Sequence, residues 1–294
     1  MRAGTPLEGT PIPDVTFATE DGLMLAADVF AQDGSRAEVL LLHGGGQNRH
    51  SWQRIAHRLQ ALGMKVIAMD VRGHGDSDWA PDGDYSREKL ALDIRAAYHH
   101  FGLSAPLVIG ASMGGLTAID GLGLHDLPAC GLVLLDVAPM TEEKGFARIQ
   151  RFMLQAPEGY DSIDAVAQAV ADYRGTPPRK GPHTGLMRNL RLTPEGRYRW
   201  HWDPRMLASR RHDADTRFAH VSRVLAQIDL PVLLLRGEHS DIVTQAAVDH
   251  FLTVAPQGRA LTISGAGHMI SGDENDGFLQ AILDFARERL PIAA

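Results

Sequence analysis

The chain of 294 residues has one cysteine, Cys130, and a single cysteine cannot form a disulfide within the chain. It has no apolar run near the ~18 residues that a membrane-spanning helix requires. Its N-terminus carries an arginine but no apolar stretch after it, unlike a signal peptide. We therefore expect a cytoplasmic protein that does not bind a membrane, with Cys130 packed as a small side chain beside an apolar strand.

Basic residues are outnumbered by acidic ones, and the net charge is −7 at pH 7. Nucleic-acid-binding domains usually have a basic surface, so we expect no nucleic-acid partner. The charge is unevenly distributed, because residues 140–225 contain 15 of the 29 Lys and Arg but 10 of the 36 Asp and Glu. This segment therefore has a charge of +5 and the rest of the chain −12, which marks it as a segment of a different kind.

What the sequence does contain is a regular alternation of short apolar runs and helical patterns. Two alternating stretches around Asp21-Gly22 predict a β-hairpin. Runs that are apolar throughout indicate parallel strands buried on both faces of a sheet. We predict a doubly wound α/β fold with a mostly parallel, eight-stranded sheet. The hairpin within 15–30 supplies two strands, and the others are expected at 38–43, 65–70, 106–110, 131–136, 231–236 and 259–264, with helices at 51–62, 86–101, from 113, at 244–254 and at 276–290.

The alternation is interrupted once, for about 85 residues. Inside the interruption the patterns are mostly helical, as at Asp161-Ser-Ile-Asp164, which resembles a capping box. Open α/β sheets bind ligands beyond the carboxyl ends of their strands, and we expect the interruption to lie there. The sequence thus predicts a core domain of residues 1–139 and 226–294 and a cap domain of residues 140–225.

The strongest chemical motif is Gly110-Ala-Ser112-Met-Gly114, which stands between an expected strand and an expected helix. In that context a G-x-S-x-G sequence is a nucleophile elbow: a sharp turn lifts the serine hydroxyl clear of the sheet, and the glycines leave room for the turn. The helix that begins at Met113 directs free N–H groups toward the position where an oxyanion forms. Ser112 is therefore the predicted nucleophile.

A serine nucleophile needs a histidine base, and the histidine needs a carboxylate to orient it. On this kind of fold they follow the serine in the order acid, then histidine. His268 comes directly after the last expected strand, in Gly265-Ala-Gly-His268, and is the predicted base. Asp241, in the loop after the preceding strand, is the predicted acid, and Asp136, at the end of another strand, is the alternative.

The second oxyanion donor is expected in the loop after the first long strand, His43-Gly44-Gly45-Gly46. We assign it to the N–H of Gly45, acting together with the N–H of Met113. The segment Asp70-Val-Arg-Gly-His-Gly-Asp-Ser77 is expected to fix a loop through hydrogen bonds rather than to take part in the chemistry. The residues expected to border the substrate pocket are Gln47, Trp52, Phe152, Met153, Trp200 and Trp202.

Together these motifs resemble the capped α/β-hydrolases, a group that includes carboxylesterases, lactonases, carbon–carbon bond hydrolases and cofactor-free haloperoxidases. They occur in order along nearly the whole chain, with Asp136-Val-Ala-Pro139 and Gly237 to Asp241 among them. The resemblance implies an α/β-hydrolase fold and a hydrolytic activity. Ser112 separates the chain from the haloalkane dehalogenases and soluble epoxide hydrolases of the group, which have aspartate there. The acid loop has one residue more than the commoner Gly-x-x-Asp, which leaves the choice between Asp241 and Asp136 open.

The predicted function is hydrolysis of a carboxylic ester or lactone of a small, partly apolar molecule through an acyl-enzyme. The alternatives are a carbon–carbon bond hydrolase or perhydrolase with the same triad, and a non-enzymatic small-molecule receptor on the same fold. The sequence has no metal-ligand spacing and no dinucleotide fingerprint, so neither a metal nor another cofactor is expected. The expected partner is a small ester-like substrate, bound by a monomer or a homodimer. The charge of residues 140–225 adds the hypothesis that cap arginines recognise an anionic group of the substrate.

Overall fold

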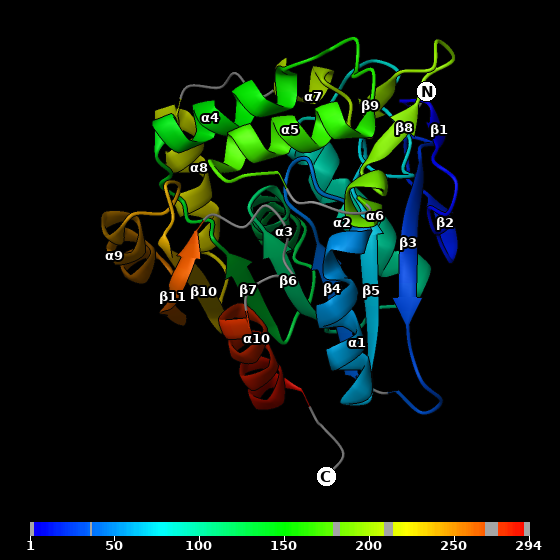
Figure 1. Cartoon of the computed structure of the whole chain (residues 1–294). Coiled ribbons are helices and arrows are strands. Elements are labelled where there is room, and N and C mark those ends of the chain that lie inside the picture. The colour runs from blue at the N-terminus through cyan, green and yellow to red at the C-terminus, as the bar shows by residue number, and fades with distance from the viewer. Residues whose placement is uncertain (1–2, 36, 179–182, 209–213, 268–275, 291–294) are drawn as a thin grey trace.

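The computed structural model describes residues 3–35, 37–178, 183–208, 214–267 and 276–290. Its central sheet has the strand order β11-β10-β7-β6-β4-β5-β3-β2 (Figure 1). Neighbouring strands pair in parallel except that β3 is antiparallel to both β5 and β2. The predicted mostly parallel, eight-stranded sheet is therefore confirmed. Its strands are β2 (Val15–Ala18), β3 (Met24–Phe30), β4 (Ala37–Leu42), β5 (Met64–Asp70), β6 (Leu107–Ala111), β7 (Gly131–Leu135), β10 (Val232–His239) and β11 (Gly258–Gly267).

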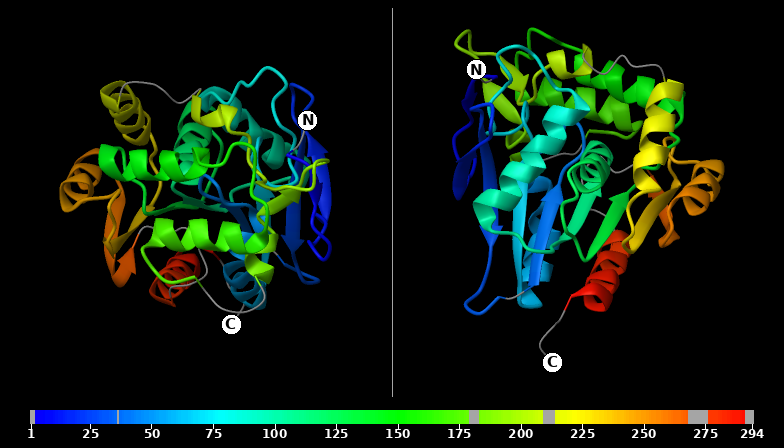
Figure 2. Two further views of the ribbon diagram at one scale, coloured as in Figure 1. Left: turned by 45° about the horizontal axis from the view of Figure 1, so that its top comes forward. Right: turned by 180° about the vertical axis from the view of Figure 1, so that it is seen from behind.

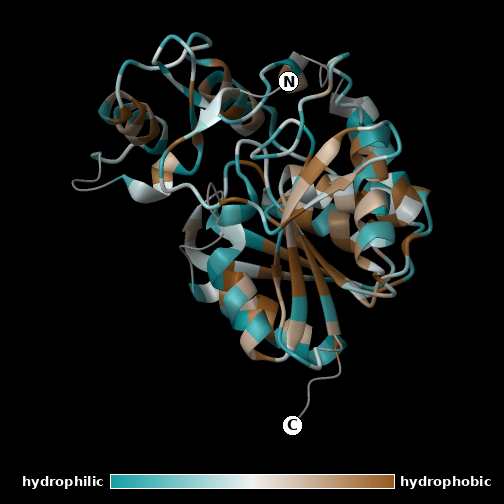
Figure 3. Cartoon of the chain, turned by 90° about the vertical axis from the view of Figure 1, so that its right-hand side faces the viewer, coloured by the Kyte–Doolittle hydropathy of each residue, from teal (hydrophilic) through white to brown (hydrophobic). Residues whose placement is uncertain are grey.

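Helices cover both faces of this sheet. Because successive side chains of a strand point to opposite faces, each central strand contributes to two cores. In β4, Leu40 and Leu42 pack in one core, and Val39 and Leu41 pack in the other. Figure 3 shows the strands as hydrophobic along most of their length, which explains the continuous apolar runs in the sequence. One face carries η1 (Arg49–Trp52), α1 (Gln53–Ala61) and α10 (Asp276–Arg289), and the other carries α2 (Arg87–Phe101), α3 (Met113–Leu124), α8 (Ala214–Leu225) and α9 (Gln245–Val254) (Figure 2).

Capping residues fix several helix ends. The Ser86 side chain accepts a hydrogen bond from the N–H of Lys89 at the start of α2, and Gly102, with φ +64°, ends that helix. At the start of α5 (Ile163–Arg174), Ser162 accepts a hydrogen bond from the N–H of Ala165, at the predicted capping sequence. No helix in the described ranges combines the length and apolar character needed to cross a membrane.

Most of the segment 140–225 lies beyond the carboxyl ends of the parallel strands, where α4 (Glu143–Leu154) and α5 run above the sheet (Figure 1). Two parts of the chain cross the boundary expected for the cap. Val221 and Val224 of α8 pack in the core cluster, so this last helix of the segment covers the sheet. Conversely, β1, near the N-terminus, pairs with β8 in a small sheet of order β1-β8-β9. The remaining elements are β1 (Thr5–Pro6), α6 (Thr184–Met187), β8 (Leu190–Leu192), β9 (Tyr198–Trp200) and α7 (Arg205–Ala208).

A buried ionic network joins the small sheet β1-β8-β9 to the core. The guanidinium of Arg49 contacts carboxylate oxygens of Asp28, Asp70 and Asp76 at 2.6–2.7 Å. Arg191 of β8 contacts the other carboxylate oxygen of Asp76 at 2.8 Å. Removing one partner of a buried ion pair leaves the other charge buried without compensation, which is strongly destabilising. The network therefore fixes β8 to the core.

Candidate active site

Ser112 lies at the turn between β6 and α3, in the strand–turn–helix context predicted for a nucleophile elbow. Its backbone has φ +45° and ψ −112°, a strained conformation for a residue with a side chain. The flanking glycines are needed because the chain approaches itself closely there. A Cβ on Gly110 would lie 2.5 Å from the nitrogen of Gly115, and a Cβ on Gly114 would lie 2.2 Å from the carbonyl oxygen of Leu42.

The loop after β4 lies against Ser112, since a Cβ on Gly44 would be 3.5 Å from the Ser112 Cβ. Buried His43 fixes this loop from below. Its Nε2 accepts a hydrogen bond from the N–H of Val71 at 3.1 Å, and its Nδ1 donates to the carbonyl of Gly44 at 2.8 Å. Burial lowers the pKa of His43, so the ring stays neutral and keeps an acceptor at Nε2.

The segment 70–77 also holds this loop. The N–H of Gly46 donates to Nε2 of His74 at 3.3 Å. Within the segment, the Ser77 hydroxyl donates to the carbonyl of Asp70 at 2.6 Å, which shapes the turn that carries His74. The prediction that these residues fix a loop is therefore confirmed by their hydrogen bonds.

Two backbone N–H groups are available beside Ser112, those of Gly45 and Met113. Both residues line the space in front of the serine. Within the described residues, neither N–H donates a hydrogen bond to the protein. Met113 is the first residue of α3, so its N–H lies at the positive end of the helix dipole. An anion in front of Ser112 would meet both donors, as expected for an oxyanion hole.

Asp136 directly follows β7, the neighbour of β6, and is fully buried. Its backbone has φ +49°, so the chain turns sharply at this residue. Its carboxylate accepts hydrogen bonds from the Ser240 hydroxyl at 2.7 Å and from the N–H of Gly237 at 3.1 Å. Asp136 is thus held at the carboxyl ends of the strands, where Ser112 also lies.

Asp241, the acid predicted first, is not buried in this way. Its side chain is 42% exposed, and one carboxylate oxygen pairs with Nη1 of Arg148 in α4 at 2.9 Å. The extra residue of this loop brings Ser240 toward Asp136 and leaves Asp241 facing the cap. His268 follows Gly267, the last residue of β11, and lies outside the described residues.

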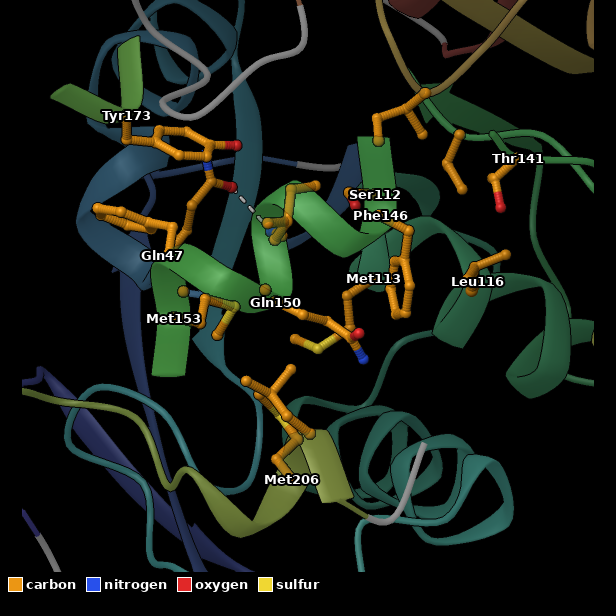
Figure 4. Close-up of a pocket in the computed structure, with 18 of the residues that line it drawn as sticks. Gln47, Ser112, Met113, Leu116, Thr141, Phe146, Gln150, Met153, Tyr173 and Met206 are labelled. Atoms are coloured by element: carbon orange, nitrogen blue, oxygen red, sulfur yellow. Dashed lines mark hydrogen bonds between the residues drawn. The ribbon is translucent and has the colours of Figure 1, made fainter. Parts of the chain in front are cut away.

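A cavity of about 100 Å³ lies in front of Ser112 (Figure 4). Three of the residues predicted to border the pocket line it, namely Gln47, Phe152 and Met153. The Gln47 amide oxygen also accepts a hydrogen bond from the N–H of Gly44 at 2.8 Å, so this side chain steadies the loop as well. The other apolar walls come from Met113, Leu116, Val137, Phe146, Ile149, Tyr173, Met206, Leu207 and Ile242.

The three tryptophans predicted to border the pocket do not line it. Trp52 is 1% exposed and packs with Ile55 in the core cluster under α1, because η1 places its side chain on the sheet side. Trp200 and Trp202 stack on each other with ring centroids 4.8 Å apart. The indole N–H of Trp202 donates to the carbonyl of Met153 at 3.3 Å, so the pair supports Met153 from behind.

Sequence reasoning missed several lining residues. Phe146 and Gln150 were missed, although they recur at helical spacing on α4 with the predicted Met153, and this periodicity was the available signal. Figure 4 shows the Gln150 amide reaching toward Met113 and Phe146. Arg217 of α8 is the only charged side chain among the described residues that line the cavity. In the described ranges, no group of three or more His, Cys, Asp or Glu residues could hold a metal ion.

The chain matches the family model described as "alpha/beta hydrolase fold" over residues 38–275. The protein belongs to the α/β-hydrolase fold family. This hydrolase is 28% identical over 262 residues to the esterase Rv0045c of Mycobacterium tuberculosis, with 85% of this chain and 82% of that protein covered. It is 25% identical to the sn-1-specific diacylglycerol lipase ABHD11 of Mus musculus, with 90% and 85% covered.

The fold of this hydrolase also agrees with a solved structure. An α/β hydrolase from Novosphingobium aromaticivorans superposes with a TM-score of 0.76 at 25% sequence identity, over 94% of this chain and 97% of that one. The family match, the esterase and lipase relatives and this superposition together identify the protein as an enzyme of the hydrolase class.

Proposed function

We propose that this hydrolase cleaves carboxylic esters or lactones, with Ser112 as the nucleophile and His268 as the base. The observation that carries the proposal is the strained elbow, which presents Ser112 to a cavity beside the N–H groups of Gly45 and Met113. Relatives that are an esterase and a diacylglycerol lipase support the same type of substrate. The apolar walls of the cavity favour an apolar acyl or alcohol part.

In the proposed mechanism, His268 takes the hydroxyl proton as Ser112 attacks the ester carbonyl carbon. The N–H groups of Gly45 and Met113 bind the resulting oxyanion more strongly than the neutral carbonyl, which lowers the barrier. The alcohol leaves with the proton held by His268, and an acyl-enzyme remains on Ser112. A water molecule that gives its proton to His268 then attacks the acyl group and releases the acid.

We assign to Asp136 the carboxylate that orients His268. A base needs a partner with a fixed direction, and Asp136 is buried and held by two hydrogen-bond donors. Asp241 is half-exposed and already paired with Arg148. Asp241 remains the alternative, and the variants Asp136→Asn and Asp241→Asn separate the two.

Turnover of p-nitrophenyl esters with acyl chains of increasing length, together with simple lactones, tests the proposed function. Ser112→Ala should lower kcat by at least ~10⁴-fold, because a triad without its nucleophile loses covalent catalysis. Its melting temperature should stay close to that of the wild type. Labelling by a fluorophosphonate that reacts with activated serines should be lost in the same variant. Turnover or labelling near the wild-type level in Ser112→Ala would contradict the proposal.

A further inference from the structure

Arg217 occupies an unusual place between two cavities. Its side chain lines the cavity in front of Ser112 and also an adjoining cavity of about 290 Å³. The two cavities share Met113, Leu116 and Phe146 as well. A molecule bound at Ser112 can therefore extend along these apolar side chains and reach the guanidinium of Arg217.

Among the described residues, the contacts of Arg217 give its charge no ionic partner. The guanidinium lies 4.9 Å from the centre of the Phe146 ring, and Nη2 donates to the Thr141 hydroxyl at 3.4 Å. Glu143 on α4 is exposed and interacts with the charge of Arg217 without forming an ion pair. Burial, and then the positive charge of Arg87, lower the pKa of Arg217.

The fully buried arginines of the described residues are Arg49, Arg72 and Arg191, and each contacts an aspartate at 2.6–2.8 Å. Such pairing is the usual condition for burying a guanidinium, because taking a charge out of water is otherwise costly. Arg217 is partly buried and lines the cavity without such a pair among the described residues.

The second cavity adds positive rather than negative charge. The one carboxylate among its described lining residues, Asp120, accepts two hydrogen bonds from Arg87 at 2.7–2.8 Å and one from His220 at 2.9 Å. Asp120 is therefore already engaged by these two partners. Nη1 of Arg87 is buried and has no hydrogen-bond partner among the residues that the structure describes. With Arg217 added, the charged groups around this cavity carry an excess of positive charge.

We propose that the substrate of this hydrolase carries a carboxylate, which Arg217 binds while Ser112 attacks the ester group. The substrate class is then a carboxylate-bearing ester, such as a monoester of a dicarboxylic acid, with an apolar chain between its two ends. This inference rests on the proposed ester hydrolysis and specifies its substrate. A guanidinium and a carboxylate form two parallel charge-assisted hydrogen bonds, so Arg217 fixes the orientation of the bound chain. Met113, Leu116 and Phe146 bury the apolar part of that chain.

Matched pairs of substrates test this proposal. Monomethyl esters of dicarboxylic acids of four to eight carbons are compared with the same esters in which a primary amide replaces the free carboxyl group. At one or two chain lengths, the wild type should prefer the acid by roughly tenfold or more in kcat/KM, as the loss of a charged hydrogen-bond partner predicts. Arg217→Gln should remove this preference mainly by raising KM for the acid, so that the acid and the amide are hydrolysed with similar kcat/KM. Arg217→Lys should retain part of the preference.

The matched control is Arg223→Gln, which makes the same change of charge at an exposed position of α8 and should retain the full preference. An independent measurement needs no variant: free dicarboxylates should inhibit wild-type turnover of a neutral p-nitrophenyl ester competitively, and their monoamides should inhibit it much more weakly. The proposal is overturned if the wild type hydrolyses acid and amide equally well, or if Arg217→Gln keeps the preference. In either case turnover of neutral esters continues. Failure of the proposed function itself would instead abolish turnover and fluorophosphonate labelling for every substrate.

Discussion

The floor and the roof of the cavity are built in different ways. The floor, residues 43–47 and 110–115, consists largely of glycines and backbone groups whose positions are fixed by close approaches and buried hydrogen bonds. The roof, α4 and α5, presents apolar side chains such as Phe152 and Tyr173, whose ring centroids lie 4.4 Å apart. With the proposed function, we expect changes in the floor to alter the rate of the reaction and changes in the roof to alter the choice of substrate. Changes in the two regions should therefore have effects of different size and kind.

The largest effect is expected from Asp136, the carboxylate next to the floor at the end of β7. Asp136→Asn should lower kcat by about 10³- to 10⁴-fold, because an amide cannot hold a histidine base in the correct tautomer. Asp241→Asn should lower it by less than about threefold, because Asp241 is exposed and pairs with Arg148 of the roof. Steady-state kinetics with a neutral p-nitrophenyl ester measure both. The reverse ranking would identify Asp241 as the acid.

An intermediate effect is expected from lowering the pH, which should decrease the free energy of unfolding. Burial lowers the pKa of His43 and His201, and burial together with the charge of Arg49 lowers that of His50 to about 4. The unfolded chain binds protons at these histidines below about pH 6.5 and the folded chain does not, so the free energy of unfolding decreases as the pH falls through that value. His50 alone should account for a loss of about 2 kcal/mol between pH 7 and pH 5.

Urea unfolding at pH 7, 6 and 5 measures this loss. In His50→Gln the dependence on pH should be shallower than in the wild type, since one of the groups that bind protons on unfolding is gone. His99→Gln, at an exposed position near the end of α2, should follow the wild type. A dependence on pH in His50→Gln as steep as in the wild type would contradict this role of His50. The opposing effect of buried Asp93, whose pKa is raised to about 6, is the same in both proteins and cancels in the comparison.

The smallest effect is expected from the roof. Met153→Ala should enlarge the cavity near Gly46, where the methionine now lies 3.5 Å from the position of a Cβ. The preferred acyl chain should become longer by one or two carbons, with a change in selectivity of about 3- to 10-fold and little change in the best kcat. A chain-length series measures the shift. Met187→Ala, in α6 and away from the cavity, is the control, and a profile identical in both variants would argue against this role of the roof.

The strand–turn–helix geometry of the floor could be predicted from the sequence because its determinants are local. The elbow at Ser112 requires glycine two residues away on each side, and the buried strands require continuous apolar runs, so both leave a direct pattern. The choice between Asp136 and Asp241 depended instead on which side chain of an irregular loop turns toward the sheet. That direction follows from the hydrogen bond between Ser240 and Asp136, residues 104 positions apart.

The roof was harder to predict because its side chains contact residues that lie far away in the sequence. The excess positive charge of 140–225 is visible in the sequence, but the partners of its arginines lie far away along the chain. Arg191 pairs with Asp76 and Arg148 with Asp241, and only the folded chain shows that Arg217 has no comparable partner in the described residues. Likewise, the helical pattern of α8 does not reveal that it packs on α3 rather than with α4.

The pairing of Arg191 with Asp76 makes the attachment of the segment 140–225 uneven. Arg191 of β8 and Asp76 are both buried, so the loss of either partner would leave a buried charge without compensation, at a cost of about 3–5 kcal/mol. The contact between Arg148 of α4 and Asp241 is half-exposed on both sides and contributes little. Substitutions that loosen the segment should therefore act far more strongly at β8 than at α4.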